Sequence, residues 1–156
     1  MLELNKFYVA EAVSFMKNNI PDNFVDLTVT SPPYDNLRTY KGFVFDYQSI
    51  LNELFRVTKI GGVVVWVVGD ATINGSETGT SFKHTRAFPV EMVKDLLQCF
   101  PNAQIILDPF IGSGTTAIAS LELGRSFIGF EINPEYVELA NQRIKNYFNE
   151  TGSKSK

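Results

Sequence analysis

Short apolar runs alternate with stretches of helical periodicity along almost the whole chain. The runs are rich in Val, Ile and Phe and stop where glycine, proline or a polar residue follows, as strands do. Between them, apolar residues recur three or four positions apart, as on the buried face of a helix. Strands that alternate with helices predict an α/β domain with a largely parallel sheet. The predicted strands lie near residues 6–9, 25–30, 63–68, 105–107 and 127–130.

One strand and the helix before it carry specific expectations about burial. Residues 63–68 form a near-continuous apolar run, which predicts a strand covered on both faces. Asp46 is a suitable N-cap for the preceding helix, and Gly61 and Gly62 are expected to end it. The predicted core face of that helix consists of Tyr47, Ile50, Leu51, Leu54 and Phe55.

The last predicted helix has clear start signals. Asn133 is a suitable N-cap and Pro134 suits the first helical position. Residues 151–156 read as a disordered tail, which leaves residues 1–150 as a single domain. The residues expected to face inward from the helix are Val137, Ala140, Ile144 and Phe148.

Composition and charge narrow the class of protein. The chain has 156 residues and a net charge of −3, which counts mildly against nucleic-acid binding without excluding a local basic patch. A single cysteine rules out an internal disulfide. Neither a secretory leader nor a membrane-spanning run is recognisable, so a cytoplasmic protein is expected.

A glycine-containing segment, Asp108-Pro109-Phe110-Ile111-Gly112-Ser113-Gly114-Thr115-Thr116, joins a predicted strand to a predicted helix. Glycines at such a turn let a ligand approach the backbone, and the new helix offers free N–H groups. Glu131 ends the next strand, where a carboxylate is suited to bind ribose hydroxyls. The spacing is neither a dinucleotide fingerprint nor a P-loop. We therefore expect a nucleoside-containing cofactor here.

A second segment, Thr30-Ser31-Pro32-Pro33-Tyr34, follows the strand at 25–30. Two prolines stiffen the loop and remove N–H donors, so its carbonyl groups are left to accept hydrogen bonds. The Ser31 hydroxyl and a neighbouring carbonyl suit an amino group, and Tyr34 offers a flat face for a base. A rigid turn that only packs locally remains the alternative interpretation of this segment alone.

Taken together, Ser-Pro-Pro-Tyr and Asp-Pro-Phe-x-Gly-Ser-Gly-Thr-Thr resemble the motifs of the amino-methylating DNA methyltransferases, in the order typical of their beta-ordered subgroup. Ala87-Phe88-Pro89-Val90 and the strand that ends at Glu131 also resemble that subgroup. The resemblance implies a Rossmann-like sheet with helices on both faces and strand order 3-2-1-4-5, with strands 6 and 7 at one edge. It also implies S-adenosylmethionine as cofactor and DNA as substrate, as in restriction-modification systems.

The resemblance also implies roles for individual residues. The tetrad Ser31, Pro32, Pro33 and Tyr34 would hold the flipped base. The residues expected around the cofactor are Asp108, Pro109, Phe110, Gly112, Ser113, Gly114 and Thr115 at its methionine part, Glu131 at the ribose, Ile132 and Glu11 near the adenine, and Phe88 and Pro89 at the carboxylate end.

The expected reaction needs no metal and no covalent enzyme intermediate. Accepting the protons of the base amino group at Ser31 and a carbonyl would make its nitrogen more nucleophilic, and the methyl group would transfer in line. A tetrad that begins with Ser favours the N4 position of cytosine over the N6 position of adenine.

The chain departs from the subgroup in one place. Strands 6 and 7 and the target-recognition region should follow Asp70, but only a polar loop at 71–85 is available, so the sheet is expected to be shortened at that edge. A missing segment, dependence on a specificity partner, and an inactive cofactor-binding relative all remain open, as does amino-methylation of RNA or of a protein amide. A homodimer or an aggregation-prone monomer is also expected, because an uncovered sheet edge invites pairing.

Overall fold

A computed structural model describes residues 2–32, 46–67, 72–73, 76–77 and 89–152 of the chain. Five strands form its main sheet, in the spatial order β1-β7-β6-β2-β3, and every neighbouring pair is parallel. The strands are β1 (Lys6–Val9), β2 (Val25–Thr30), β3 (Thr58–Trp66), β6 (Ile105–Asp108) and β7 (Ser126–Glu131).

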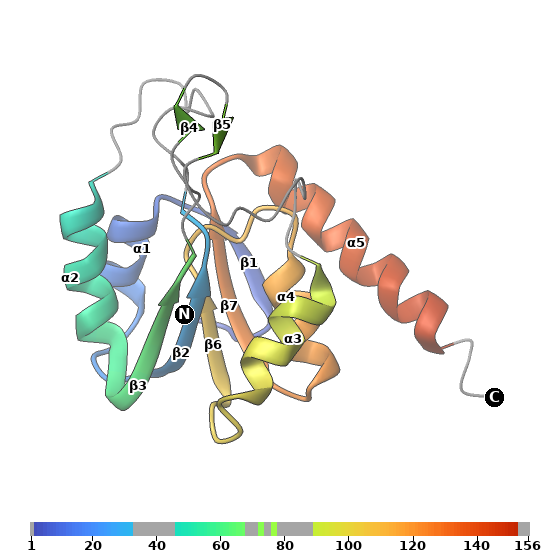
Figure 1. Ribbon diagram of the computed structural model, residues 1–156, viewed down its shortest axis with the longest axis horizontal. Helices are drawn as coiled ribbons and strands as arrows, with labels where there is room; N and C mark the ends of the chain where they lie inside the picture. The colour runs from blue at the N-terminus through green and yellow to red at the C-terminus, as the bar shows by residue number, and fades with distance from the viewer. Residues whose placement is uncertain (1, 33–45, 68–71, 74–75, 78–88, 153–156) are drawn as a thin grey trace.

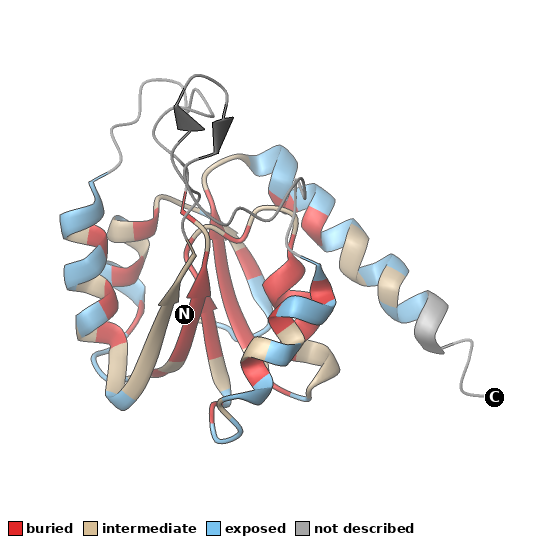
Figure 2. Ribbon diagram, in the orientation of Figure 1, coloured by how far each residue is buried: buried red, intermediate tan, exposed pale blue. Residues whose placement is uncertain are grey.

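Helices cover both faces of this sheet, so the domain has three layers (Figure 1). On one face, the cluster around Met16 and Leu54 packs against β6 and β7; on the other, Val93 and Ile118 pack against β2 and β6. Buried residues follow the central strands and the inward sides of the helices (Figure 2). One face carries α1 (Ala12–Asn19) and α2 (Tyr47–Val57), and the other carries α3 (Val90–Gln98), α4 (Thr115–Glu122) and α5 (Pro134–Gly152).

The sheet confirms the predicted fold class and strand order. With β6, which precedes the glycine segment, counted as strand 1, the order reads 3-2-1-4-5. All five predicted strands are present, with ends shifted by a few residues. Within the predicted loop at 71–85, the two short strands β4 (Thr72–Ile73) and β5 (Ser76–Glu77) pair antiparallel with each other and are separate from the main sheet.

Two burial predictions on the β3 side were wrong. The α2 helix buries Ile50, Leu54 and Val57 and ends at Val57, while Gly61 and Gly62 lie inside β3. Strand β3 is only half-buried because it is the edge strand of the main sheet. The side chains that were wrongly assigned to the core are exposed: Tyr47 by 61%, Leu51 by 43% and Phe55 by 87%.

The last helix begins as predicted and runs further. The Asn133 side chain accepts a hydrogen bond from the backbone N–H of Glu135, which is the expected capping contact. Val137 and Ala140 are buried, but Phe148 is 38% exposed, so its predicted inward position was wrong. The helix extends to Gly152, two residues past the expected boundary of the domain.

No helix in the described part of the chain is long and apolar enough to cross a membrane.

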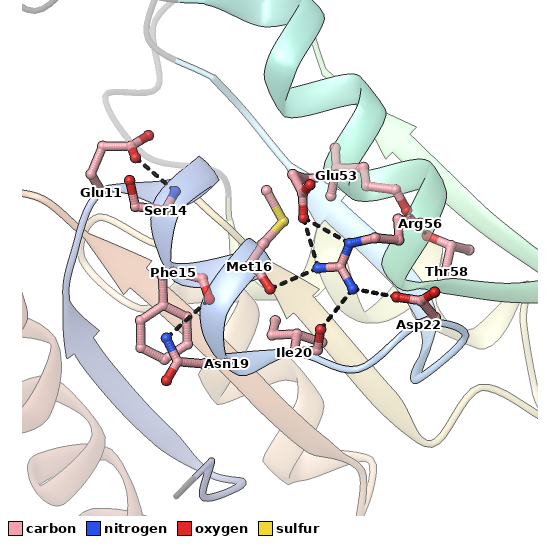
Figure 3. Close-up of polar contacts among 11 residues, drawn as sticks. Glu11, Ser14, Phe15, Met16, Asn19, Ile20, Asp22, Glu53, Arg56 and Thr58 are labelled. Carbon is pink, nitrogen blue, oxygen red and sulfur yellow. Dashed lines mark hydrogen bonds and ion pairs between the residues drawn. The ribbon is translucent and has the colours of Figure 1, made fainter.

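One arginine fastens the two helices on the same face to each other (Figure 3). The Arg56 guanidinium donates to the carbonyl oxygens of Met16 and Ile20, at the carboxyl end of α1, over 2.8 and 2.9 Å. It also pairs with Asp22 and Glu53 over 2.5 and 2.7 Å. These carboxylates raise the pKa of Arg56, with the Glu53 hydrogen bond as the main cause. Arg56 thus adds a charged donor to two carbonyls at the end of α1, where intrahelical donors run out.

Replacing Arg56 with methionine is expected to lower the free energy of unfolding by about 2–3 kcal/mol, because two carboxylates and two carbonyls lose a charged donor together. Urea denaturation measures this loss. The free energy of unfolding of Arg56→Lys should lie between those of the unmodified chain and the methionine variant, since one ammonium group cannot make the forked hydrogen bonds of the guanidinium. A methionine variant as stable as the unmodified chain would show that the contacts are dispensable.

Candidate functional site

The predicted ligand segments meet at the carboxyl ends of the central strands. Asp108 ends β6 and Glu131 ends β7, and the register places Asp108 opposite Gly129, two residues before Glu131. Strand β2, on the other side of β6, ends at Thr30. The connections diverge on either side of β6, so the site lies at the switch point of the sheet, where open α/β sheets bind ligands.

The backbone of the glycine segment adopts a conformation that residues with side chains rarely adopt. Gly112 and Gly114 have φ angles of +49° and +83°, in the left-handed region, and Gly114 is the N-cap of α4. A Cβ atom on Gly114 would lie 3.1 Å from the Cβ of Ala140 and 3.2 Å from Phe7. The N–H of Ile111 donates to the carbonyl of Phe130 over 2.9 Å, which holds the loop against β7. The loop therefore lies at the carboxyl end of the sheet, in a backbone conformation that favours glycine at positions 112 and 114.

Asp108 is buried, with 5% of its surface exposed, and is bound by the protein itself. Its Oδ1 accepts from the Thr30 hydroxyl over 2.8 Å and from the Phe110 N–H over 3.1 Å. Its Oδ2 accepts from the Thr116 hydroxyl over 2.7 Å. Burial, and to a smaller extent the charge of Glu131, raises the pKa of Asp108 to about 6 against the opposing effect of these hydrogen bonds.

The raised pKa predicts how stability depends on pH at this residue. The folded state binds the Asp108 proton up to about pH 6 and the unfolded state only to about pH 4, so ionisation of Asp108 costs stability as the pH rises between these values. Asp108→Asn cannot ionise. The difference in free energy of unfolding, Asp108→Asn minus the unmodified chain, should therefore become about 2 kcal/mol more positive between pH 4 and pH 7.5. Urea denaturation at both pH values checks this, and a difference independent of pH would contradict it.

Glu131, the predicted ribose ligand, is held by the start of the next segment. It is 9% exposed, and its Oε1 accepts from the N–H of Asn133 over 3.0 Å. Among the described residues, none donates a hydrogen bond to its Oε2. One oxygen thus fixes the carboxylate, and the predicted binding of a ribose hydroxyl by Glu131 stays a prediction. Ile132 follows and is half-buried.

Glu11 has a structural function that sequence analysis did not predict. Its two carboxylate oxygens accept from the N–H groups of Val13 and Ser14 over 2.9 and 2.8 Å, which caps α1. Partial burial opposes ionisation, but hydrogen bonds from Ser14 and Val13 still lower the pKa of Glu11. The residue follows β1, next to the end of β7, since the N–H of Ala10 donates to the carbonyl of Glu131. Its predicted place near the adenine stays a prediction.

The tetrad begins at the end of β2. The carbonyl of Thr30 accepts from the N–H of Val67 over 2.9 Å, which fixes this end of the strand to β3. Ser31 is half-buried and Pro32 is buried. Pro33 and Tyr34 lie outside the described residues, as does Phe88. Pro89 is the exposed residue before α3, so its contact with the cofactor also stays a prediction.

Sequence analysis assigned no role to three residues that support the site. Thr30 and Thr116 bind Asp108 from the strand on one side and the helix on the other. Arg143, on α5, donates to the carbonyl and hydroxyl oxygens of Ser113 and to the hydroxyl of Thr115, over 2.9 to 3.1 Å. The contacts of Thr30 and Arg143 join residues far apart in sequence, whereas Thr116 lies in the glycine segment itself, eight residues after Asp108.

Comparison with known proteins shows which proteins this chain resembles. Residues 73–142 match the N6/N4 methyltransferase family model, which is described as DNA methylase. The orphan methyltransferase M.BamHII of Bacillus amyloliquefaciens is 29% identical, over 85% of this chain and 93% of that protein. Two type II methyltransferases match 92% of this chain but only 47% and 48% of their own lengths. These matches support an amino-methyltransferase, as the tetrad and the glycine segment predicted.

Solved structures share the fold. A putative DNA modification methylase from Thermus thermophilus was solved in complex with S-adenosylmethionine; it superposes with a TM-score of 0.71 at 22% identity, over 90% of this chain and 93% of that one. The PvuII DNA methyltransferase, which is cytosine-N4-specific, superposes with a TM-score of 0.68 at 14% identity, over 92% and 90% of the two chains. The predicted S-adenosylmethionine methyltransferase fold is therefore confirmed.

The comparison with M.BamHII also shows a difference in length. Its alignment extends over 246 positions, whereas this chain has 156 residues, so at least 90 positions have no counterpart here. M.BamHII thus contains residues that this chain lacks.

Proposed function

We propose that this chain transfers a methyl group from S-adenosylmethionine to the exocyclic amino group of a flipped base in DNA. The observation that carries the proposal is the meeting of two motifs at one end of the sheet. The segment that contains Ser31 and the glycine segment that begins at Asp108 are joined by the hydrogen bond between Thr30 and Asp108. A base-binding loop and a cofactor loop must adjoin for a direct transfer.

The residues present fit the cofactor. Gly112 and Gly114 have positive φ angles and no side chains, so a ligand can approach the backbone at the start of α4, where N–H groups lack helical partners. The Oε2 of Glu131 suits a ribose hydroxyl, and half-buried Ile132 beside it suits the adenine. Bound S-adenosylmethionine would supply an electrophilic methyl group on its sulfonium sulfur, with S-adenosylhomocysteine as the leaving group and with loss of one proton from the methylated amino nitrogen to solvent.

The chain's own residues would activate and place the base. The Ser31 hydroxyl and a carbonyl of the tetrad accept hydrogen bonds from the amino group, which withdraws its lone pair from the ring and directs it at the methyl group. Pro32 is buried, and its ring restricts φ, which stiffens the loop that carries Ser31. Tyr34 stacks on the flipped base, which compensates part of the few kcal/mol that unstacking costs.

Cytosine N4 is the favoured target because the tetrad begins with serine, and the fold neighbour PvuII DNA methyltransferase is cytosine-N4-specific. Adenine N6 is the alternative. The product distinguishes the two, since digestion of methylated DNA to nucleosides yields either N4-methyldeoxycytidine or N6-methyldeoxyadenosine.

The short middle of the chain favours a second candidate, in which the chain binds cofactor but needs another polypeptide for target recognition. At least 90 positions of the M.BamHII alignment have no counterpart here, and the described strands between β3 and α3 are two residues long. The missing positions would include the target-recognition region. A homodimer would be the simplest way to cover the edge of β3.

Two measurements test the proposal. Calorimetric titration with S-adenosylmethionine should give saturable binding, and tritium from labelled cofactor should enter unmethylated DNA of random sequence. Binding without transfer would favour the partner-dependent candidate over an independent enzyme. The absence of binding by the folded chain would overturn both.

A further inference from the structure

The tetrad segment and the cofactor segment are connected through one buried carboxylate. Thr30 is the last residue of β2 and immediately precedes Ser31, and its hydroxyl donates to Asp108 Oδ1 over 2.8 Å. Thr116, on α4, donates to Asp108 Oδ2 over 2.7 Å. Thr30 and Thr116 are 2% and 5% exposed, so water does not compete for these bonds. The carboxylate thus joins β2, the end of β6 and the first turn of α4.

A second threonine on the same strand shows that this contact is specific to Thr30. Thr28 is fully buried two residues earlier, so it points to the same side of β2. Its hydroxyl has no hydrogen-bond partner among the described residues. The two residues are therefore a matched pair, equal in type, strand and burial, and only Thr30 reaches Asp108.

We propose that Thr30 is a positioning residue, whose hydrogen bond to Asp108 sets the distance between the amino group held at Ser31 and the cofactor held by the glycine segment. This inference rests on the proposed function. The peptide that follows Thr30 leads directly to Ser31, and the carbonyl of Thr30 is already fixed by Val67. The Asp108 bond fixes the same residue from the cofactor side, so the strand end has two anchors.

The bond is suited to alignment rather than to binding the cofactor. Without the Thr30 hydroxyl, Asp108 still accepts from Phe110 and Thr116, so the glycine segment keeps its own anchors. The end of β2 loses its only described side-chain bond to that segment. A displacement of about 1 Å at a reacting centre can lower a rate by about a hundredfold.

The test uses Thr30→Val, which keeps the shape of the side chain and removes the hydroxyl, with Thr30→Ser to restore it. Thr28→Val is the matched control. Thr30→Val should lower kcat, counted per cofactor-binding site, by about ten- to a hundredfold, while the Kd for S-adenosylmethionine changes less than threefold. Thr30→Ser and Thr28→Val should stay within about threefold of the unmodified chain in both quantities.

A fluorescence measurement tests the connection without turnover. Trp66, the single tryptophan, is in register with Thr30 on the neighbouring strand, and its ring meets that of Phe110 edge-on at 6.5 Å. Cofactor binding should therefore change the emission of Trp66, and Thr30→Val should alter that change whereas Thr28→Val should not.

The possible outcomes separate this inference from the proposed function. If the unmodified chain does not bind S-adenosylmethionine, the proposed function fails and this inference fails with it. If Thr30→Val turns over and reports cofactor binding like the unmodified chain, only the positioning role is overturned. If Thr30→Val loses turnover and cofactor affinity in the same proportion, Thr30 is merely structural and the inference is also overturned.

Discussion

Truncation of Glu131 to alanine is expected to weaken the binding of S-adenosylmethionine by about a hundredfold. The carboxylate lies at the end of β7, nearly buried, with Oε1 fixed by the N–H of Asn133. Hydrogen bonds to a charged group contribute about 1.5–3 kcal/mol each, and about 3 kcal/mol corresponds to roughly a hundredfold change in Kd. Calorimetric titration of both proteins measures the change directly.

The control for this prediction is Glu135→Ala. Glu135 is exposed in the first turn of α5, four residues after Glu131, so its removal changes the net charge equally without altering the site. Glu131→Gln should give an intermediate affinity, because the amide keeps the shape of the side chain but loses the charge. Unchanged affinity in Glu131→Ala, with urea denaturation showing a folded protein, would remove Glu131 from the cofactor site.

Most of the sheet could be predicted because each strand is a short, continuous signal. The runs at 25–30 and 127–130 coincide closely with β2 and β7, since the first is rich in β-branched residues and the second in apolar ones. The glycine segment was equally readable, because the positive φ angles of Gly112 and Gly114 permit few other residues. Strand order required more than pattern, and came from the family resemblance that the observed order confirms.

The helix α2 shows where the pattern is ambiguous. Apolar residues occur at two helical spacings: Ile50, Leu54 and Val57 form one stripe, and Tyr47, Leu51 and Phe55 form another. Periodicity alone cannot say which stripe meets the sheet, and the prediction combined members of both. The structure buries the first stripe and exposes the second.

The contacts of Asp108 show a second kind of limit. Sequence analysis placed this residue at the cofactor because it precedes the glycines, yet its oxygens accept three hydrogen bonds from the protein. Its partner Thr30 is 78 positions away in the chain. Long-range pairing of this kind depends on the parallel arrangement of β2 and β6, which no local motif encodes. The residue type was readable, but its function as a link between two segments was not.

The second large effect is expected at Ser31, where alanine should lower turnover by about a hundredfold or more while the Kd for S-adenosylmethionine stays within about threefold. The hydroxyl is proposed to accept a hydrogen bond from the base amino group as that nitrogen attacks, and loss of one hydrogen-bonding group aimed at a transition state costs about 10²- to 10³-fold in kcat. Ser31 follows β2, on the opposite side of the Thr30–Asp108 bond from the glycine segment, so its loss should leave the cofactor loop intact.

The split between turnover and cofactor affinity is what distinguishes a base-binding role from a structural one. Ser31 is half-buried, so a structural role would appear as lower stability and as a parallel loss of both quantities. Transfer of tritium from labelled cofactor to DNA, measured beside calorimetry and urea denaturation, separates the two cases. Ser31→Asp extends the test, because aspartate begins the tetrad of many adenine-N6 enzymes: it should retain more turnover than alanine, since a carboxylate also accepts a hydrogen bond from an amino group. If alanine turned over like the unmodified chain, activation of the amino group would have to come from the backbone carbonyls of the tetrad alone.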